Sequence, residues 1–265
     1  MFTDNDAGRF LFHYTSGDVF LTHILPTMRM RMSSFSRLND PRESKNWVCN
    51  LVNPDGLQQE WDLAAVSEEF TARIKGSAKV LCLVQDDPYL NPGRTEYLYG
   101  RGYAHPSMWD RYANHHSGVC LAFDREQLGQ DLSAAVSSRG DLMSGAVSYQ
   151  SMSANDVEAF ELDAGDLESK GIEQALRDHQ RLHATALFFC KSRDWESEFE
   201  FRWVLLGDSE AGEPYIDVSR SLKGVLFGDA FLPHAIPMVA SVVEGREIVL
   251  ARIVYRNGDP IVLPA

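Results

Sequence analysis

The sequence predicts a single α+β domain covering residues 1–265, with a mixed central sheet and helices packed against it. Short apolar segments typical of strands alternate along the chain with segments whose apolar residues recur at helical spacing. Hydrophobic residues make up 44% of the chain and aromatic residues 11%, enough to form a sizeable core. No internal repeat and no stretch resembling an interdomain linker interrupts this pattern, so one domain accounts for the chain.

The expected strands are short segments that are continuously apolar or that alternate apolar with polar residues. They lie near residues 9–14, 28–32, 79–85, 118–123, 143–149, 199–206, 223–227 and 246–255. The expected helices show helical spacing or begin at a proline that follows a capping residue. They lie near residues 17–26, 58–74, 153–162, 166–189 and 231–243, and two more begin at Pro41 and Pro106. Between them, residues 86–104 form a long loop, a kind of segment that is often functional.

The formal net charge is −13, and an acidic surface repels phosphate backbones, so broad nucleic-acid binding is not expected. The N-terminus has no basic segment followed by an apolar one, and no apolar run approaches the roughly 18 residues of a membrane span. The four cysteines are far apart in the sequence and form no CxxC motif, which is typical of buried free thiols. We therefore expect a cytoplasmic protein with no membrane anchor.

A basic segment lies near the N-terminus of this acidic chain. In residues 28–32 methionine alternates with arginine, so a strand places the methionines on one face and Arg29 and Arg31 on the other. In the following SRLNDPRES segment, Asn39 or Asp40 can cap a helix that begins at Pro41, and Glu43 can reach back to the cap. Capping alone explains these residues, but such a helix start also favours an anionic group.

The segment from Trp195 to Trp203 carries the most informative charges. Read as a strand, it places Glu198, Glu200 and Arg202 on one face. The opposite face is aromatic and consists of Phe199, Phe201 and Trp203. The charged face is either an exposed surface on which Arg202 pairs with Glu200, or a rigid support that holds two carboxylates at a defined spacing.

Two further histidine positions are candidates for chemistry. His13 ends the first strand beside Tyr14, where it is either a satisfied turn histidine or a hydrogen-bonding group at a pocket lip. His179 and His183 are four residues apart on a helix, a spacing that can bind a metal ion. Because no HExxH motif and no partner carboxylate accompany them, packed or water-bonded histidines are favoured.

Five segments in order resemble a bacterial family known as domain of unknown function 2971. They are FHYTS, SSFSRLNDPRE, SMWDRYANHHSGVCLAF, VSYQ and KSRDWESEFEFRWV. The resemblance runs from about residue 10 to about residue 230.

The opening of the chain is similar, more distantly, to that of ADP-ribosyltransferases of the His-Tyr-Glu type. The resemblance implies an ADP-ribosyltransferase-like fold and a transferase for which NAD is the substrate. It gives His13 the role of holding a ribose hydroxyl, Glu200 or Glu198 that of the catalytic carboxylate, and Tyr112 that of the aromatic residue. In such a mechanism a carboxylate stabilises the positive charge that develops on the ribose as nicotinamide leaves.

The same reading predicts which residues contact NAD. They are His13, Tyr14, Arg29, Arg31, Asn39 and Arg202, with Arg29 or Arg31 neutralising the pyrophosphate. No metal cofactor is expected, the ligand is a small nucleotide, and the biological role is that of a toxin or a component of phage defence.

Two other classes of function remain open. One is a metal-dependent hydrolase or nuclease that uses Glu198, Glu200 and a His or Asp as ligands. The other is a non-catalytic binding or regulatory module of a bacterial defence system, in which the same polar face recognises a partner. The protein or nucleic-acid target is undetermined in all three.

Overall fold

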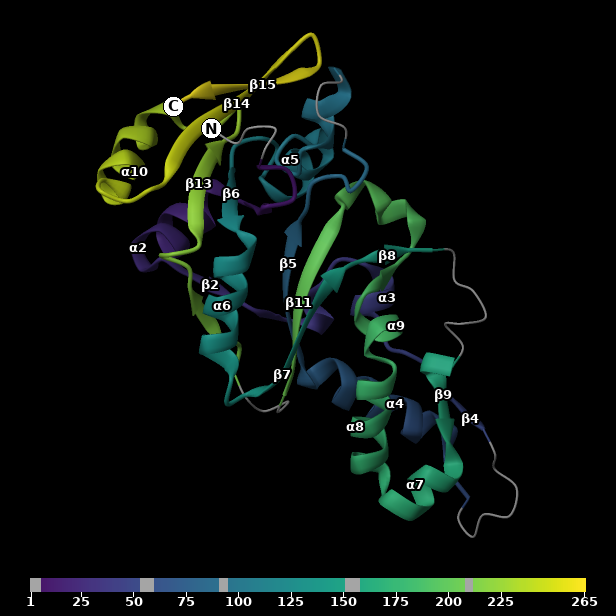
Figure 1. Ribbon diagram of the computed structural model, residues 1–265. Helices are drawn as coiled ribbons and strands as arrows, with labels where there is room; N and C mark the ends of the chain where they lie inside the picture. Colours follow the sequence, from purple (N-terminus) through teal and green to yellow (C-terminus); the bar gives the residue numbers. More distant parts are fainter. Residues whose placement is uncertain (1–5, 53–59, 91–94, 151–157, 208–211) are drawn as a thin grey trace.

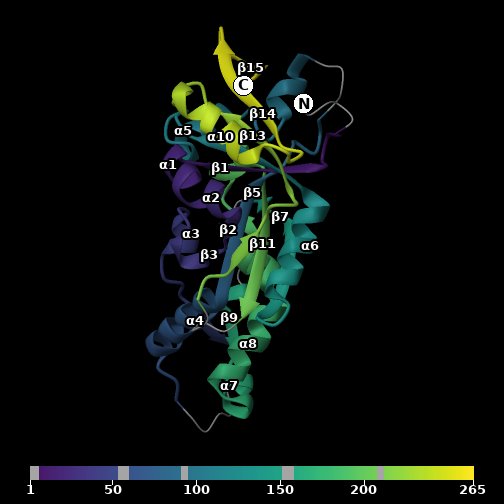
Figure 2. The ribbon, with the colours of Figure 1, turned by 90° about the vertical axis from the view of Figure 1, so that its left-hand side faces the viewer.

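The computed structural model describes residues 6–52, 60–90, 95–150, 158–207 and 212–265. A large mixed sheet runs through the molecule, with helices on both of its faces (Figures 1 and 2). The predicted α+β class with a mixed central sheet is therefore confirmed.

Among the described residues the main sheet has nine strands, which come from the first to the last part of the chain. They are β1 Phe10–Thr15, β3 Ser33–Ser34, β5 Ala78–Val84, β6 Val119–Asp124, β7 Gly140–Ala146, β11 Glu200–Gly207, β13 Leu222–Phe227, β14 Val249–Arg256 and β15 Asp259–Pro264. Their order is β15-β14-β13-β6-β1-β5-β11-β7, with β3 also paired to β5. All these neighbours are antiparallel except β13 and β14, which are parallel.

Three two-stranded sheets join segments that are far apart in the sequence. They are β2 Arg29–Arg31 with β12 Tyr215–Asp217, β8 Ser148–Tyr149 with β10 Cys190–Lys191, and β4 Asn50–Val52 with β9 Glu161–Asp163. The first pair is antiparallel and the other two are parallel.

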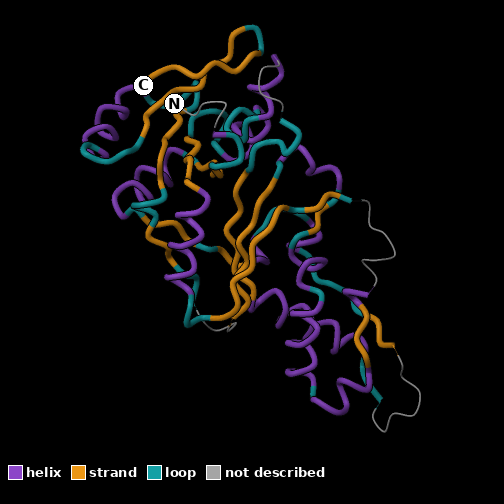
Figure 3. The backbone as a smooth tube through the Cα atoms, in the orientation of Figure 1, coloured by secondary structure: helices purple, strands orange, loops and turns teal. Residues whose placement is uncertain are grey.

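The helices surround the sheet, as the tube view of Figure 3 shows. The α-helices are α1 Gly17–Val19, α2 Leu25–Thr27, α3 Pro41–Ser44, α4 Leu63–Ser77, α5 Pro106–Tyr112, α6 Arg125–Val136, α7 Ala164–Lys170, α8 Ile172–Leu182, α9 Ala184–Phe188 and α10 Ile236–Val243. A π-helical turn, Phe20–Ile24, joins α1 to α2. Short 3-10 helices are Phe35–Arg37, Thr95–Gly100, Glu158–Phe160, Arg193–Glu198 and Pro233–Ala235. Among the described residues no helix combines the length and the apolar composition needed to cross a bilayer.

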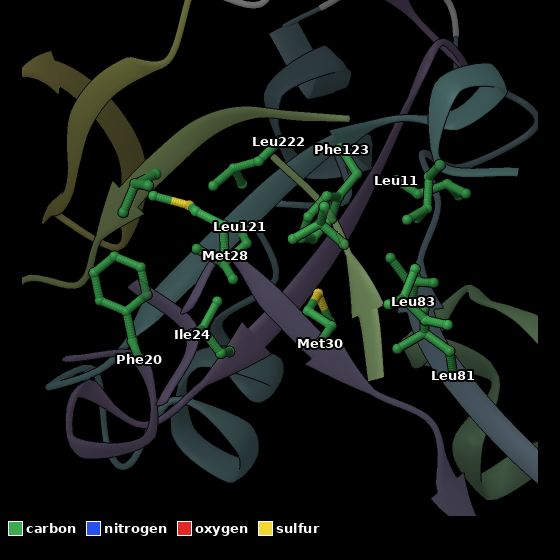
Figure 4. Packing of buried hydrophobic residues seen from close by; sticks show 14 of the residues in the cluster. Leu11, Phe20, Ile24, Met28, Met30, Leu81, Leu83, Leu121, Phe123 and Leu222 are labelled. Atoms are coloured by element: carbon green, nitrogen blue, oxygen red, sulfur yellow. The ribbon is translucent and has the colours of Figure 1, made fainter. Parts of the chain in front are cut away.

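One face of the sheet packs against α2, α6, α10 and the β2–β12 pair. Met28, Met30 and Met32 are buried in this core together with leucines of β1, β5 and β6 (Figure 4). Arg29 and Arg31 are exposed on the other side of β2. The predicted alternation of this segment is therefore confirmed.

The opposite face of the sheet carries two separate hydrophobic clusters. One packs α4, α8 and α9 against β5 and β11, and the other packs α5 against β1 and β6. Between the two clusters, β1 and β5 pair at a single position, Phe12 with Val84, whereas β5 and β11 pair along their whole length. We call the boundary between β1 and β5 the seam of the sheet. The polar residues described below lie beside it.

Several predicted boundaries are wrong. The expected helix near 153–162 is instead, in its described part, a 3-10 turn followed by β9, and 153–157 lie outside the described residues. The expected helix near 166–189 is divided into α7, α8 and α9, because Gly171 adopts a positive φ of 76° between the first two. The helix expected near 58–74 begins at Leu63, where the Asp62 side chain accepts from Ala64 N; residues 58 and 59 lie outside the described ranges. Helix α6 was not expected at all.

Candidate functional site

A pocket of about 140 Å³ lies between the two clusters, on the seam of the sheet. Six of the residues predicted for the site line it: His13, Tyr14, Asn39, Tyr112, Glu198 and Glu200. A broader groove of about 1300 Å³ lies on the other face, between α6 and β7. We place the candidate site in the smaller pocket because buried carboxylates converge there, and desolvated charges mark functional sites.

The backbone before β11 departs from the predicted strand. Residues 193–198 form a 3-10 helix, and Phe199 then adopts a left-handed conformation with φ 45°. The Phe199 ring consequently leaves the face of Phe201 and Trp203 and stacks on His105, with ring centroids 5.3 Å apart. The predicted aromatic face is therefore wrong at Phe199, although Glu198 and Glu200 still reach the same pocket.

Arg202 anchors the floor of the pocket. Its side chain is fully buried, and its guanidinium donates to both oxygens of Glu200, from Nε to Oε1 at 2.7 Å and from Nη2 to Oε2 at 2.9 Å. The same Nη2 donates to Oε1 of Glu43, and Nη1 donates to the carbonyl of Phe188 at 2.7 Å. Arg202 pairs with Glu200, as one interpretation of the sequence predicted. The exposed surface that this interpretation assumed is wrong, because both residues are buried.

Lys191 links the two predicted carboxylates. Its Nζ lies 2.9 Å from Oε2 of Glu198 and 2.8 Å from Oε2 of Glu200. Burial would lower the pKa of Lys191, but the carboxylates around it, Glu200 foremost, raise that pKa above its ordinary value. The other oxygen of Glu198 accepts a 2.8 Å hydrogen bond from the hydroxyl of Tyr112. Glu198 and Glu200 are thus held by opposite charges rather than by solvent.

The carboxyl groups differ in their tendency to ionise. Burial of Glu200 opposes its ionisation, but Arg202 and Lys191 overcome that effect and lower its pKa to about 2. Burial raises the pKa of Glu43 more than the charges of Arg202 and Lys191 lower it. Tyr112 also has a raised pKa, because it is buried and because Glu198 disfavours a second negative charge.

His13 is half-buried in the seam, with Nδ1 3.1 Å from the carbonyl oxygen of Cys82. Burial lowers the pKa of His13, and this hydrogen bond opposes the effect only in part. A carbonyl oxygen can only accept, so the hydrogen of a neutral ring resides on Nδ1 and Nε2 is an acceptor. Nε2 can therefore accept a hydrogen bond from a hydroxyl group.

Other predicted contacts fall elsewhere. Arg29 and Arg31 are exposed on β2, which packs on the opposite face of the sheet, and Arg31 pairs with Glu213 at 3.3 Å, so their predicted contact with a ligand in this pocket is wrong. Arg37, largely exposed, lines the pocket instead, and it also pairs with Glu213, at 3.3 Å. Tyr14 lines the pocket, but its hydroxyl donates to the carbonyl of Gly102 at 2.8 Å.

Sequence reasoning missed Lys191 and assigned a different role to Glu43. Of the two predicted caps, Asn39 and Asp40, it is Asp40 that caps α3, with its side chain accepting from Arg42 N at 2.9 Å. Glu43 does not reach back to this cap; its carboxyl group turns into the protein and meets Arg202. A charged residue directly after the apolar run LFFC was the available signal for Lys191, since a lysine entering the core needs carboxylate partners.

The predicted histidine pair is packed rather than arranged around an ion. His179 Nε2 lies 2.9 Å from the carbonyl oxygen of Ala159, and its ring centroid is 4.3 Å from that of His183. In the part of the chain that the structure describes, no three His, Cys, Asp or Glu side chains are grouped so that they could hold one metal ion.

The comparisons with known proteins give one match. Residues 108–203 match the family described as Protein of unknown function (DUF2971). This confirms the resemblance to that family over these residues, and the matched segment carries Tyr112, Lys191, Glu198 and Glu200. No curated protein and no solved structure matches the chain.

Proposed function

We propose that this pocket binds NAD and that the protein breaks the bond between its nicotinamide and its ribose, as an ADP-ribosyltransferase-like enzyme. The observation that carries the proposal is Glu200, a buried carboxylate that stays ionised because Arg202 and Lys191 surround it. Such a group is aimed before the substrate arrives, which is what electrostatic stabilisation of a transition state requires.

The chemistry follows from the charges. When the bond between ribose C1′ and the nicotinamide nitrogen breaks, its electron pair stays on nitrogen and nicotinamide leaves as a neutral molecule. Positive charge then develops on the ribose, and a carboxylate beside C1′ stabilises it most in the transition state. Glu200 and Glu198, which line one pocket, are the two candidates for that carboxylate.

The surrounding residues can position the dinucleotide. His13, neutral with Nε2 as an acceptor, suits a ribose hydroxyl. Arg37 is the exposed cation on the pocket lining and suits the pyrophosphate, the role that Arg29 and Arg31 cannot fill. An attacking acceptor or water adds to C1′ and gives up its proton, which completes the transfer.

NAD should raise the midpoint of thermal unfolding. A ligand at one hundred times its Kd stabilises a protein by about 2.7 kcal/mol, which corresponds to roughly 5–10 °C for a domain of this size. Differential scanning fluorimetry with NAD, with ADP-ribose and with a divalent metal alone measures this, and chromatography of the same samples detects free nicotinamide. No stabilisation and no nicotinamide, also after addition of cell extract, would contradict the proposal, and stabilisation by metal alone would favour a metal-dependent hydrolase.

Tyr112→Phe should leave the fold intact and lower the rate of nicotinamide release by about tenfold, because it removes the hydrogen bond that orients Glu198. The ring stays in place, so a stacking contact with the substrate is retained. The comparison of kcat with KM decides the role: a lower kcat at constant KM indicates that the hydroxyl orients the carboxylate. An unchanged rate in a normally folded variant removes the hydroxyl from the mechanism, though not the ring.

A second candidate function is non-catalytic binding of a nucleotide at the same pocket. It is favoured by one observation: both Glu198 and Glu200 are already paired with Lys191, so neither depends on a substrate for its partner. Stabilisation by NAD without any release of nicotinamide would select this alternative.

A further inference from the structure

The carboxyl group of Glu43 is unusually poor in partners. The side chain is almost completely buried and lines the pocket. Its Oε1 accepts from Arg202, whereas no donor among the described residues reaches its Oε2. A desolvated anionic oxygen without a donor is costly, and a proton on that oxygen removes most of the cost.

The charge balance of the cluster points to the same oxygen. Three buried carboxyl groups, Glu43, Glu198 and Glu200, surround two buried cations, Lys191 and Arg202. Glu200 contacts both cations, and Glu198 contacts Lys191 together with a hydroxyl donor, while Glu43 shares one guanidinium nitrogen with Glu200. Among these five described side chains the negative charges exceed the positive ones by one, and the carboxyl group with the fewest donors is the one that takes up a proton.

The charges that face Glu43 from its other sides do not change this assignment. The ammonium group of Lys75 in α4 donates to the backbone carbonyls of Arg42, Glu43 and Lys45, at 2.8 Å for Glu43. Its hydrogen bonds thus go to the backbone and not to the carboxyl group of Glu43. Asp40 accepts at the helix cap through Oδ1; its Oδ2 also has no donor among the described residues, but Asp40 does not line the pocket. Arg42 donates to the carbonyl of Ala186. Arg111, a partly exposed cation of α5, lies 3.6 Å from Glu198 rather than beside Glu43.

We propose that Glu43 holds a proton at neutral pH and that its O–H donates a hydrogen bond to a carbonyl oxygen of the ligand bound in the pocket. This step rests on the proposed function, in which that oxygen belongs to the carboxamide of nicotinamide. The amide nitrogen of the same group can donate a hydrogen bond to Glu198 or Glu200, and the positive pyridinium ring of NAD is attracted by their negative charges. Nicotinic acid has a negative carboxylate and no amide donor, and the same carboxylates repel it.

Glu43→Gln tests the proton without any ligand. Glutamine replaces a neutral carboxylic acid by a neutral group of the same size and needs no proton uptake on folding, so the thermal midpoint of Glu43→Gln at pH 7 should be no lower than that of the wild type. Glu200→Gln is the matched control: it makes the same substitution beside the same Arg202, but it removes an ionised group, and its midpoint should fall by roughly 6–12 °C. An equal fall in both variants would overturn the protonation of Glu43.

The pH dependence supplies a second readout. A carboxyl group whose pKa is raised on folding stabilises the protein fully below its unfolded pKa of 4.5 and loses that effect as the pH rises through the folded value. The difference between the two thermal midpoints, wild type minus Glu43→Gln, should therefore decrease as the pH rises above 4.5. A difference that increases over the same range would show that Glu43 ionises more readily in the folded protein, and the proposal would be wrong.

Isothermal titration with nicotinamide and with nicotinic acid tests the recognition step. The wild type should bind nicotinamide about tenfold more tightly than nicotinic acid. Glu43→Gln retains a donor and should keep the affinity of the wild type for nicotinamide. Glu43→Leu has no donor and should bind nicotinamide about tenfold more weakly than the wild type. Equal affinity of wild type and Glu43→Leu would reject Glu43 as the donor while the proposed function stands. If Glu43→Leu does not fold, Glu43→Met, which also lacks a donor, takes its place in the same comparison. If the wild type binds neither nicotinamide nor NAD, the recognition step fails together with the proposed function, and the stability measurements still decide the proton.

Discussion

Arg202→Met should lower the free energy of unfolding by about 3–5 kcal/mol, the largest stability effect expected for a single side chain of the site. The guanidinium is fully buried and donates to Glu200, Glu43 and the carbonyl of Phe188. Methionine fills much of the same volume but leaves Glu200 in the interior with Lys191 as its cationic partner among the described residues. Chemical denaturation of both proteins at pH 7 measures the difference.

Two further variants separate the lost pairing from a general defect in packing. Arg177→Met removes an exposed arginine of α8 that pairs with Glu173 at 2.6 Å, and it should leave the denaturation midpoint nearly unchanged. The double variant Glu200→Gln, Arg202→Met should be more stable than Arg202→Met alone, because Glu198 and Glu200 then no longer share the charge of Lys191. If Arg202→Met behaves like Arg177→Met, the buried ion pairs do not support this part of the fold.

Local patterns in the sequence predicted those parts of the fold that local physics determines. The alternation in 28–32 and the apolar run of β6 predicted their strands, because one face or both must be buried. The cap at Asp40 was predicted for a similar reason, since its side chain satisfies a backbone group two residues away. Helix α6 was overlooked even though Asp124 caps it in the same way, because its apolar residues are few.

The arrangement of the site depends on contacts that no local pattern contains. Glu43 and Arg202 are 159 positions apart, and they meet because α3 lies over the face of β11 that carries Arg202. The capping motif offered a complete local explanation for Glu43, so its long-range partner could not be predicted. Phe199 was misplaced because a left-handed residue interrupts the strand period, and nothing in a phenylalanine signals that conformation. The polar ends of two strands were nonetheless sufficient to bring His13, Glu198 and Glu200 into one predicted site, and all three line one pocket.

The same buried charges have consequences for stability and for chemistry. In a solvated site, cations beside a carboxylate would be screened and would orient it weakly; here Arg202 and Lys191 hold Glu200 in the interior, where electrostatic interactions are stronger. A ligand that enters the pocket therefore meets a carboxylate whose direction is already determined. The cost is a fold that depends on each partner of the cluster, so variants of these residues need a stability measurement beside every activity measurement.

Glu200→Gln should reduce the release of nicotinamide from NAD by at least about 100-fold, the loss typical of removing one preorganised electrostatic group. It should also destabilise the protein, because Glu200 is ionised and paired in the folded state. The pKa of Glu200 falls from 4.5 to about 2 on folding, which corresponds to about 3 kcal/mol at neutral pH. Because the folded pKa is lowered, this contribution is complete above pH 4.5 and is lost as the pH falls towards 2.

Glu198→Gln is the matched control for activity. It makes the same substitution two residues away, in a side chain that is equally buried and also paired with Lys191, yet it should lower the rate by only about tenfold. The reason is geometric: Glu200 is in β11, paired on both sides to β5 and β7, whereas Glu198 ends a 3-10 turn outside the sheet. Rates are compared at a temperature where circular dichroism shows all three proteins folded. Equal release of labelled nicotinamide by wild type and Glu200→Gln would reject Glu200 as the catalytic carboxylate, and a greater loss in Glu198→Gln would transfer that role to Glu198.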